Sequence, residues 1–250
     1  MNLIEYQCHA GTAIIQLNRP NKKNALNHEM YTELNKCLDT ALADHDVKSV
    51  ILTGHEDFFT TGHDLQDFAE AKTPDDLNAV SKFIITIATY AKPIIAAVNG
   101  PCIGIGTTLL LHCDLLYAGT ETYFHMPFSQ LGLTPEAGSS YLLPALMGQQ
   151  KAAQYLLLGE PFSAKTALEL GLVNEIIDKS KVLAHALEKA AVLSQYPIDS
   201  LLATKSLLKS SSQTKALSTI QKELPLFFKQ LQQPHAQNAF HSFLKNQTTS

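Results

Sequence analysis

The sequence predicts an α/β fold that ends in a helical region. Extended apolar runs alternate with helical patterns through most of the chain, which is typical of α/β folds. The run Pro93–Val98 is continuously apolar, as expected for a strand buried on both faces of a sheet. Helical patterns dominate from Ser139 onward. We therefore place an α/β core at residues 1–196 and a helical region at residues 197–250.

The first half of the chain supplies most of the predicted strands. They are short apolar runs bounded by turn residues, at residues 13–17, 50–52, 93–98, 115–118 and 123–125. The helices predicted between them show apolar residues at helical spacing, at residues 28–43, 74–90 and 107–112. In the first of these helices, Met30, Leu34 and Leu38 recur every four residues.

The second half returns to extended structure only at residues 171–175, Gly171-Leu172-Val173-Asn174-Glu175. A helical tail starts near Pro197 and includes residues 214–232 and 236–245. With 250 residues, 45% of them hydrophobic, the chain can bury a large core. Charged residues make up 17%, so part of the surface is expected to be hidden between subunits.

Composition excludes several classes of function. The net charge is −4 and no basic run is longer than Lys22-Lys23, so no nucleic-acid surface is expected. No apolar run reaches the roughly 18 to 20 residues that span a bilayer, and the N-terminus lacks a signal pattern, so we expect a cytoplasmic protein without membrane contact. The four cysteines and the sequence His112-Cys113-Asp114 lack metal-site spacing, so no metal is expected.

Small residues precede the apolar helix expected at residues 107–112. Gly104-Ile105-Gly106 exposes backbone at its start, and the glycines permit close approach of a ligand. The first turn of a helix has unpaired amide groups, and the helix dipole favours negative charge there. This pattern predicts an oxyanion site built from amide N–H groups. A second donor is expected in residues 58–65, where a glycine turn follows a strand.

A single carboxylate stands out near this site. Glu136 lies in Leu133-Thr134-Pro135-Glu136-Ala137-Gly138-Ser139-Ser140-Tyr141, which holds no other charge. Such a carboxylate can take a proton from the α-carbon of a thioester whose oxygen is held by the amides. From the local sequence, Glu136 is equally well explained as a capping or surface residue before the helix that starts at Ser139.

These motifs resemble, in order, those of the crotonase superfamily, the enoyl-CoA hydratase/isomerase family. They are Asn18-Arg19-Pro20, Asn24-Ala25-Leu26, Gly62-His63-Asp64-Leu65, Lys92-Pro93, Ala97-Val98-Asn99-Gly100, Cys113-Asp114 and Gly171-Leu172-Val173. The resemblance implies a spiral of ββα turns that assembles through its C-terminal helices as a homotrimer or dimer of trimers. It implies an acyl-CoA thioester substrate and no cofactor apart from the coenzyme A of that substrate.

The resemblance also assigns roles to residues. It implies that the amides of His63 and Ile105 hold the oxyanion, beside Gly62 and Gly104. His63 then acts through its backbone, and its imidazole is expected to face solvent or to support the site from behind. The other implied substrate contacts are Lys23, Asn24, Ala25 and Leu26 toward coenzyme A, Thr61, Asp64 and Leu65 beside His63, Phe128 and Leu133 along the acyl chain, and Lys245 toward the adenine of a neighbouring subunit. A solvated charge pair is an equal alternative for Lys22-Lys23, and we favour a helix cap for Asp64.

Two positions depart from the hydratase pattern of the family. Members that add water carry two glutamates, where this chain has Thr108 and Phe128. Hydration needs one group to activate water and another to handle the α-carbon proton, so that pair is missing. Glu136 remains, in a motif that resembles the Δ3-Δ2-enoyl-CoA isomerase branch.

In that branch, one glutamate moves a proton from C2 to C4. We therefore expect an isomerase of fatty acid degradation that converts 3-enoyl-CoA to 2-trans-enoyl-CoA. A hydratase or another crotonase-fold acyl-CoA enzyme is the first alternative, and a non-catalytic acyl-CoA binder is the second.

Overall fold

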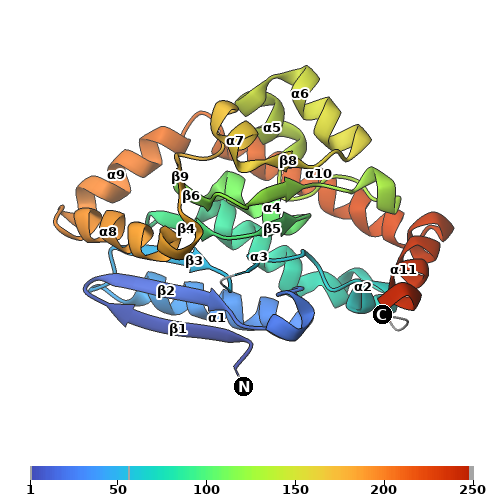
Figure 1. Ribbon diagram of the computed structural model, residues 1–250, viewed down its shortest axis with the longest axis horizontal. Helices are drawn as coiled ribbons and strands as arrows, with labels where there is room; N and C mark the ends of the chain where they lie inside the picture. Colours follow the sequence, from blue (N-terminus) through green and yellow to red (C-terminus); the bar gives the residue numbers. More distant parts are fainter. Residues whose placement is uncertain (1, 56, 248–250) are drawn as a thin grey trace.

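The computed structural model describes residues 2–55 and 57–247, with side chains as far as residue 242. The described part of the chain contains a six-stranded sheet in the order β1-β2-β3-β4-β6-β9 (Figure 1). β1 and β2 pair antiparallel, and the other neighbours pair parallel. The strands of this sheet are β1 (Ile4–His9), β2 (Thr12–Leu17), β3 (Ser49–Thr53), β4 (Ile94–Val98), β6 (Leu115–Gly119) and β9 (Glu175–Ile177).

A smaller sheet branches from the end of β4. It consists of β5 (Pro101–Ile103), β7 (Tyr123–His125) and β8 (Phe162–Ser163), in the order β5-β7-β8. Gly100 makes the turn between β4 and β5 with φ of +63°, and a Cβ atom there would lie 2.0 Å from the carbonyl oxygen of Asp57. Only glycine fits this turn, which redirects the chain toward the segment that begins α4.

The helices cover the two sheets and form the C-terminal region. They are α1 (His28–Ala43), α2 (Leu65–Glu70), α3 (Asn78–Thr89), α4 (Ile105–Thr108), α5 (Ser139–Met147), α6 (Gln149–Ala153), α7 (Ala164–Glu169), α8 (Val182–Ser194), α9 (Ile198–Lys209), α10 (Gln213–Leu231) and α11 (Pro234–Gln247). Each residue of β4 is buried, which confirms the prediction of a strand covered on both faces. On one face, Val182, Ala186 and Ala190 of α8 pack against Ile51 and Ile95.

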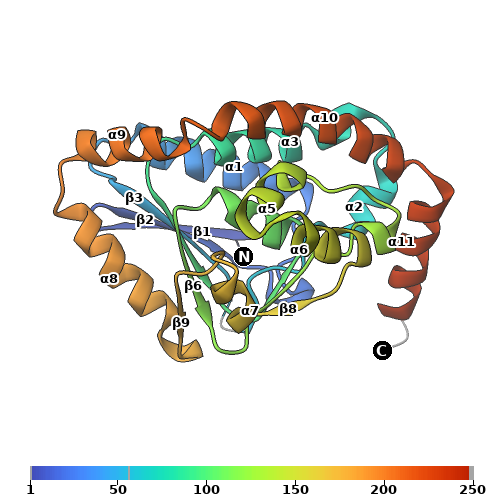
Figure 2. The same cartoon turned by 90° about the horizontal axis from the view of Figure 1, so that it is seen from above.

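α9 and α10 run along one edge of the molecule, and α11 turns away from them at its end (Figure 2). α10 packs against α3 and α5, and α11 packs against α2. Glu136 and His63 line a cavity together with Leu224 and Phe227 of α10, so the C-terminal region helps to build the site. In the described residues, we find no helix with the length and hydropathy needed to cross a bilayer.

The structure confirms the α/β fold with a C-terminal helical region and corrects some boundaries. The helix expected at residues 107–112 begins at Ile105, and its second half, Leu109–His112, is a 3-10 helix. Extended structure expected at residues 171–175 begins only at Glu175. Gly171 has φ of +80°, and the amides of Leu172 and Val173 both donate to the carbonyl of Ala167, so this stretch closes α7.

Candidate active site

The loop that carries Leu26 and the loop that carries His63 lie side by side, although they are distant in sequence. The amide of Leu26 donates to the carbonyl of Gly62 over 2.7 Å, and the amide of Asp64 donates to the carbonyl of Leu26 over 2.9 Å. This parallel bridge pairs Leu26 with His63. In such a bridge the central residue's own N–H points away from its partner, and the amide of His63 has no backbone acceptor among the described residues.

The second predicted amide lies on the neighbouring segment. Gly104, just before α4, has φ of +56° and ψ of −121°, and the place of its absent Cβ is open space. The absent Cβ of Gly62 would lie 2.6 Å from the carbonyl oxygen of Ile103, so the two segments touch. The amide of Ile105 is the first of α4 and also has no backbone acceptor among the described residues. This arrangement can present two N–H groups to an oxyanion.

Glu136 sits on a tight turn before α5. Ala137 and Gly138 follow it with φ of +57° and +73°, a left-handed pair that reverses the chain. Ser139 donates to the carbonyl of Glu136 from its amide over 3.1 Å and from its hydroxyl over 2.6 Å. His112 donates from Nε2 to the carbonyl of Ala137 over 2.7 Å. Burial lowers the pKa of His112 to about 4, so the imidazole is neutral at physiological pH.

The carboxylate of Glu136 is buried, with one oxygen hydrogen-bonded and the other facing an imidazole. The residue is 1% exposed. The Thr108 hydroxyl donates to Oε1 over 2.7 Å, and Nε2 of His63 lies 3.6 Å from Oε2. Thr108 comes three residues after Ile105 on α4, so one short helix carries the amide and the group that holds the carboxylate.

A second buried carboxylate, Glu223 of α10, anchors the same turn. Its Oε2 accepts the amide of Gly138 over 2.6 Å. Its Oε1 accepts the amide of Ser140 over 3.1 Å and the Ser140 hydroxyl over 2.5 Å. Burial raises the pKa of Glu223 above its ordinary value, these hydrogen bonds oppose the rise, and the negative charge of Glu136 adds to it.

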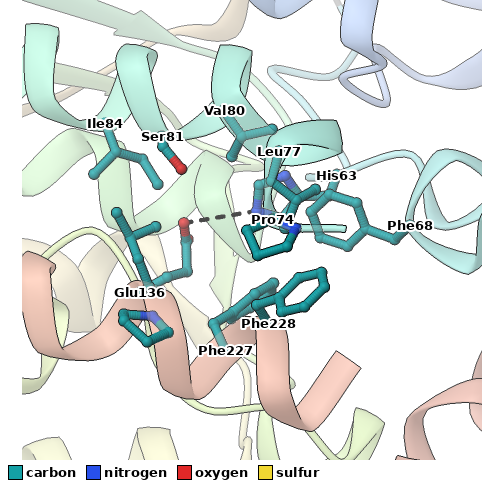
Figure 3. A pocket seen from close by; sticks show the side chains of 12 residues that line it. His63, Phe68, Pro74, Leu77, Val80, Ser81, Ile84, Glu136, Phe227 and Phe228 are labelled. Carbon is teal, nitrogen blue, oxygen red and sulfur yellow. Dashed lines mark ion pairs between the residues drawn. The ribbon is translucent and has the colours of Figure 1, made fainter. Parts of the chain in front are cut away.

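A cavity of about 280 Å³ opens beside Glu136 and His63 (Figure 3). The other residues that line it come from α2, the segment before α3, α3 and α10: Phe68, Pro74, Leu77, Val80, Ser81, Ile84, Leu224, Pro225, Phe227 and Phe228. Apolar side chains dominate this lining, so the cavity can hold an apolar chain next to one carboxylate. No group of side chains with metal-binding composition occurs in the described ranges.

Among the predicted substrate contacts, Asn24 and Asp64 have structural roles in the two loops, whereas Lys23 lies at the surface. Lys23 is exposed, while Asn24 is fully buried, accepts the amide of Arg19 and donates to the carbonyl of Phe59. Asn24 therefore ties the two loops together. Asp64 caps α2 by accepting the amide of Gln66, as the sequence predicts, and pairs with Arg19 over 2.6 Å.

Other predicted contacts lie elsewhere. Phe128 and Leu133 are buried in the hydrophobic core and do not line the cavity. Thr61 donates to the carbonyl of Lys23, and Leu65 begins α2. The side chain of Lys245 lies outside the described residues. The imidazole of His63 was expected to face solvent or lie behind the site, but its side chain is 6% exposed and lines the cavity.

Sequence reasoning missed three polar residues of the site. Thr108 enters the sequence analysis only as the position where a hydratase carries a glutamate. Tyr31, whose hydroxyl lies 2.6 Å from Nδ1 of His63, belongs to the buried stripe of α1, and Glu223 belongs to that of α10. A detectable signal existed for Glu223. It interrupts the buried series Ala216, Ile220, Phe227, Leu231 at helical spacing, and a carboxylate in such a stripe must have partners.

Comparisons with known proteins agree with this architecture. The family model described as enoyl-CoA hydratase/isomerase matches residues 7–249. Enoyl-CoA delta isomerase 2 of Rattus norvegicus is 36% identical over 211 residues, which are 82% of this chain and 54% of the rat protein. This chain thus spans about half the length of that relative.

Two further similarities cover most of both chains. The 2,3-dehydroadipyl-CoA hydratase of Escherichia coli K12 is 32% identical over 215 residues, 86% of this chain and 84% of the relative. Among solved structures, Pseudomonas aeruginosa OdaA has a TM-score of 0.93 at 39% identity, covering 97% of this chain and 99% of OdaA.

Proposed function

Because the chain belongs to the enoyl-CoA hydratase/isomerase family, we propose that it converts 3-enoyl-CoA to 2-trans-enoyl-CoA in fatty acid degradation. The observation that carries the proposal is the position of Glu136. It is the one carboxylate among the described residues that line the apolar cavity, and it lies beside two loops whose amides lack acceptors. A carboxylate that faces an acyl chain next to such donors can relocate a proton along that chain.

The reaction needs one proton carrier. Glu136 takes a proton from C2, and the electron pair of that C–H bond moves toward the thioester carbonyl oxygen. The amides of His63 and Ile105 donate to the dienolate oxygen that results. Glu136 then returns the proton to C4, and the double bond settles between C2 and C3. Thr108 holds Oε1 of the carboxylate throughout.

Hydration of a 2-enoyl-CoA is the second candidate. It is favoured by the imidazole of His63, a second protonatable group beside Glu136 in the same cavity, and by the relative named as a hydratase. Against it, Thr108 and Phe128 stand where hydratase-like members carry glutamates. Thr108 is committed to Glu136, and Phe128 is buried outside the cavity.

Product analysis separates the candidates. The purified protein is incubated with 3-enoyl-CoA and with 2-enoyl-CoA, and the products are resolved by chromatography. We expect 2-enoyl-CoA from the first substrate and little 3-hydroxyacyl-CoA from the second. Predominant 3-hydroxyacyl-CoA would favour a hydratase. Binding of the thioester without exchange of the C2 hydrogen in heavy water would indicate a non-catalytic binder.

Coenzyme A enters as part of the substrate, and we propose no separate cofactor. The exposed Lys23, on the loop that contacts Gly62 and Thr61, is the proposed contact to the 3′-phosphate and adenine of coenzyme A. Lys245 is the proposed contact to the adenine bound by a neighbouring subunit. Both roles predict that neutralising either lysine raises KM for the thioester more than it lowers kcat.

We also propose assembly as a homotrimer or a dimer of trimers. Leu207 and Leu208 at the end of α9 are 76% and 75% exposed, and Leu226 of α10 is 52% exposed. Large exposed apolar side chains are typical of surfaces that become buried between subunits. Sedimentation equilibrium of the purified chain tests the assembly directly, and a monomer at micromolar concentration would contradict it.

A further inference from the structure

The imidazole of His63 lies between two buried oxygen atoms from other elements. Its Nδ1 is 2.6 Å from the hydroxyl of Tyr31 on α1, and its Nε2 is 3.6 Å from Oε2 of Glu136. The ring of Phe68 packs against the imidazole with the centroids 4.3 Å apart. The three polar side chains are almost completely buried, so bulk water does not set their hydrogen bonds.

The contact between Tyr31 and His63 determines which nitrogen of the imidazole carries the proton. Burial raises the pKa of Tyr31 well above its ordinary value, so its hydroxyl keeps its hydrogen. His63 Nδ1 is the one hydrogen-bond partner of that hydroxyl among the described residues. A buried hydroxyl hydrogen needs an acceptor. Nδ1 can accept it only with a free lone pair, and the neutral imidazole then carries its own proton on Nε2.

The contact between His63 and Glu136 requires the same tautomer, with the proton on Nε2. Oε1 has its donor in Thr108, but neither Oε2 of Glu136 nor Nε2 of His63 has a hydrogen-bond partner among the described residues. With the proton on Nε2, a donor faces a carboxylate oxygen, and a small movement closes the 3.6 Å gap to a hydrogen bond. With the proton on Nδ1, two lone pairs would face each other in a buried site.

We propose that Tyr31 fixes His63 as the Nε2–H tautomer, and that His63 is a positioning residue that directs this N–H at Oε2 of Glu136. The inference rests on the proposed role of Glu136 as the proton carrier. Two donors, from Thr108 and His63, then orient the carboxylate, which takes the proton from C2. Because Nε2 already holds a proton, His63 is not a second base, and this supports isomerisation over hydration.

Paired substitutions separate the two ends of the imidazole. In His63→Gln, the side-chain amide can reach the place of Nε2 and donate to Glu136. In His63→Asn, the shorter amide reaches only the place of Nδ1, and Glu136 loses its donor. Both variants keep the backbone amide of residue 63. We expect kcat of the Gln variant to exceed that of the Asn variant roughly tenfold, the usual effect of one hydrogen bond to a charged group, at similar KM.

The same exchange at a remote histidine is the control. Nε2 of His185 on α8 lies 3.2 Å from Oε2 of Glu175, a histidine–glutamate contact outside the cavity. His185→Gln and His185→Asn should have equal kcat. Equal losses in the two His63 variants would show that the imidazole only fills space, and would overturn the proposal.

The tautomer itself is measured without an activity assay. Long-range proton–nitrogen NMR spectra of the full chain, with isotope-labelled histidine, distinguish Nε2–H from Nδ1–H, and His63→Gln identifies the signals. We expect Nε2–H in the wild type and loss of this preference in Tyr31→Phe. A wild-type proton on Nδ1 would overturn the proposal. This readout does not depend on catalysis, so it can succeed while the proposed isomerase activity fails, and the reverse.

Discussion

The hydroxyl of Thr108 donates a 2.7 Å hydrogen bond to Oε1 of Glu136, and both residues are buried. Thr108 also belongs to α4, the helix whose first amide is that of Ile105. Three residues of helix rise by about 4.5 Å. The residue that binds the Glu136 carboxylate therefore lies one helical turn from the residue whose amide is the proposed oxyanion donor. The relative position of base and oxyanion is thus set by one short element.

Replacing Thr108 by valine should remove this link and keep the shape of the side chain. Oε1 would lose a donor to a charged group, an interaction worth about 1.5–3 kcal/mol, so we expect kcat to fall at least tenfold. Thr108→Ser keeps the hydroxyl and should retain most of the activity. Steady-state kinetics of both variants check this, and equal rates for valine and wild type would contradict the role of the hydrogen bond.

Replacing Glu136 by glutamine should abolish proton transfer and leave the cavity intact. Loss of a positioned general base lowers turnover by a factor of about a hundred or more, and we expect that loss in kcat. Affinity for the CoA thioester, measured by calorimetry, should change little, because the amide has nearly the same shape. Near-normal turnover of 3-enoyl-CoA by this variant would refute the assignment of Glu136.

The sequence predicts the parts of this site that are local in the chain. Glycines before an apolar helix predict amide donors around residues 104–106, and the uncharged stretch around it makes Glu136 a candidate. The roles of Ile105 and Glu136 come from the family resemblance. Four strands of the central sheet, β2, β3, β4 and β6, follow from apolar runs. The edge strand β1 mixes polar with apolar residues and is not predicted, and the short strands β5 and β8 have too few residues to show a period.

The contacts between distant segments could not be predicted in this way. The imidazole of His63 meets Tyr31 and Glu136, which lie 32 residues before and 73 residues after it. No local pattern encodes these contacts, so the only role expected for His63 is the backbone role that the family resemblance implies. Glu223 is a similar case, because it meets the Glu136 turn across a sequence separation of 85 residues to Gly138.

Removing the Glu223 carboxylate should loosen the turn that carries Glu136. Glu223→Ala leaves the amides of Gly138 and Ser140 without their acceptors, and the unsatisfied amide of the buried Gly138 alone costs about 1–3 kcal/mol. We expect a lower free energy of unfolding and a lower kcat, with a smaller loss in Glu223→Gln, which keeps one acceptor oxygen. Denaturant unfolding and kinetics measure both effects.

The neighbouring residue on α10 offers a control for charge. Lys222 is exposed, so Lys222→Gln changes the helix charge without touching the turn. Its stability should stay within about 0.5 kcal/mol of wild type. If Glu223→Ala behaved like this control, the contacts of Glu223 would contribute nothing to the turn.

His112 should make folding stability depend on pH below neutrality. Its pKa is about 4 in the folded protein because burial disfavours the charged form, and 6.5 is the ordinary value in an unfolded chain. Between these values the unfolded chain binds a proton that the folded protein does not. Stability therefore falls as the pH drops from 6.5 to 4, by at most about 3 kcal/mol.

The comparison with His112→Gln isolates this contribution. Glutamine can still donate to the carbonyl of Ala137 and does not titrate, so we expect the variant to lose less stability than wild type over this pH range. Denaturant midpoints at several pH values measure the difference, and His9→Gln on the exposed face of β1 should follow wild type. Parallel losses in His112→Gln and wild type would mean that His112 does not sense pH. The neutral imidazole would then serve only as the donor that shapes the Glu136 turn.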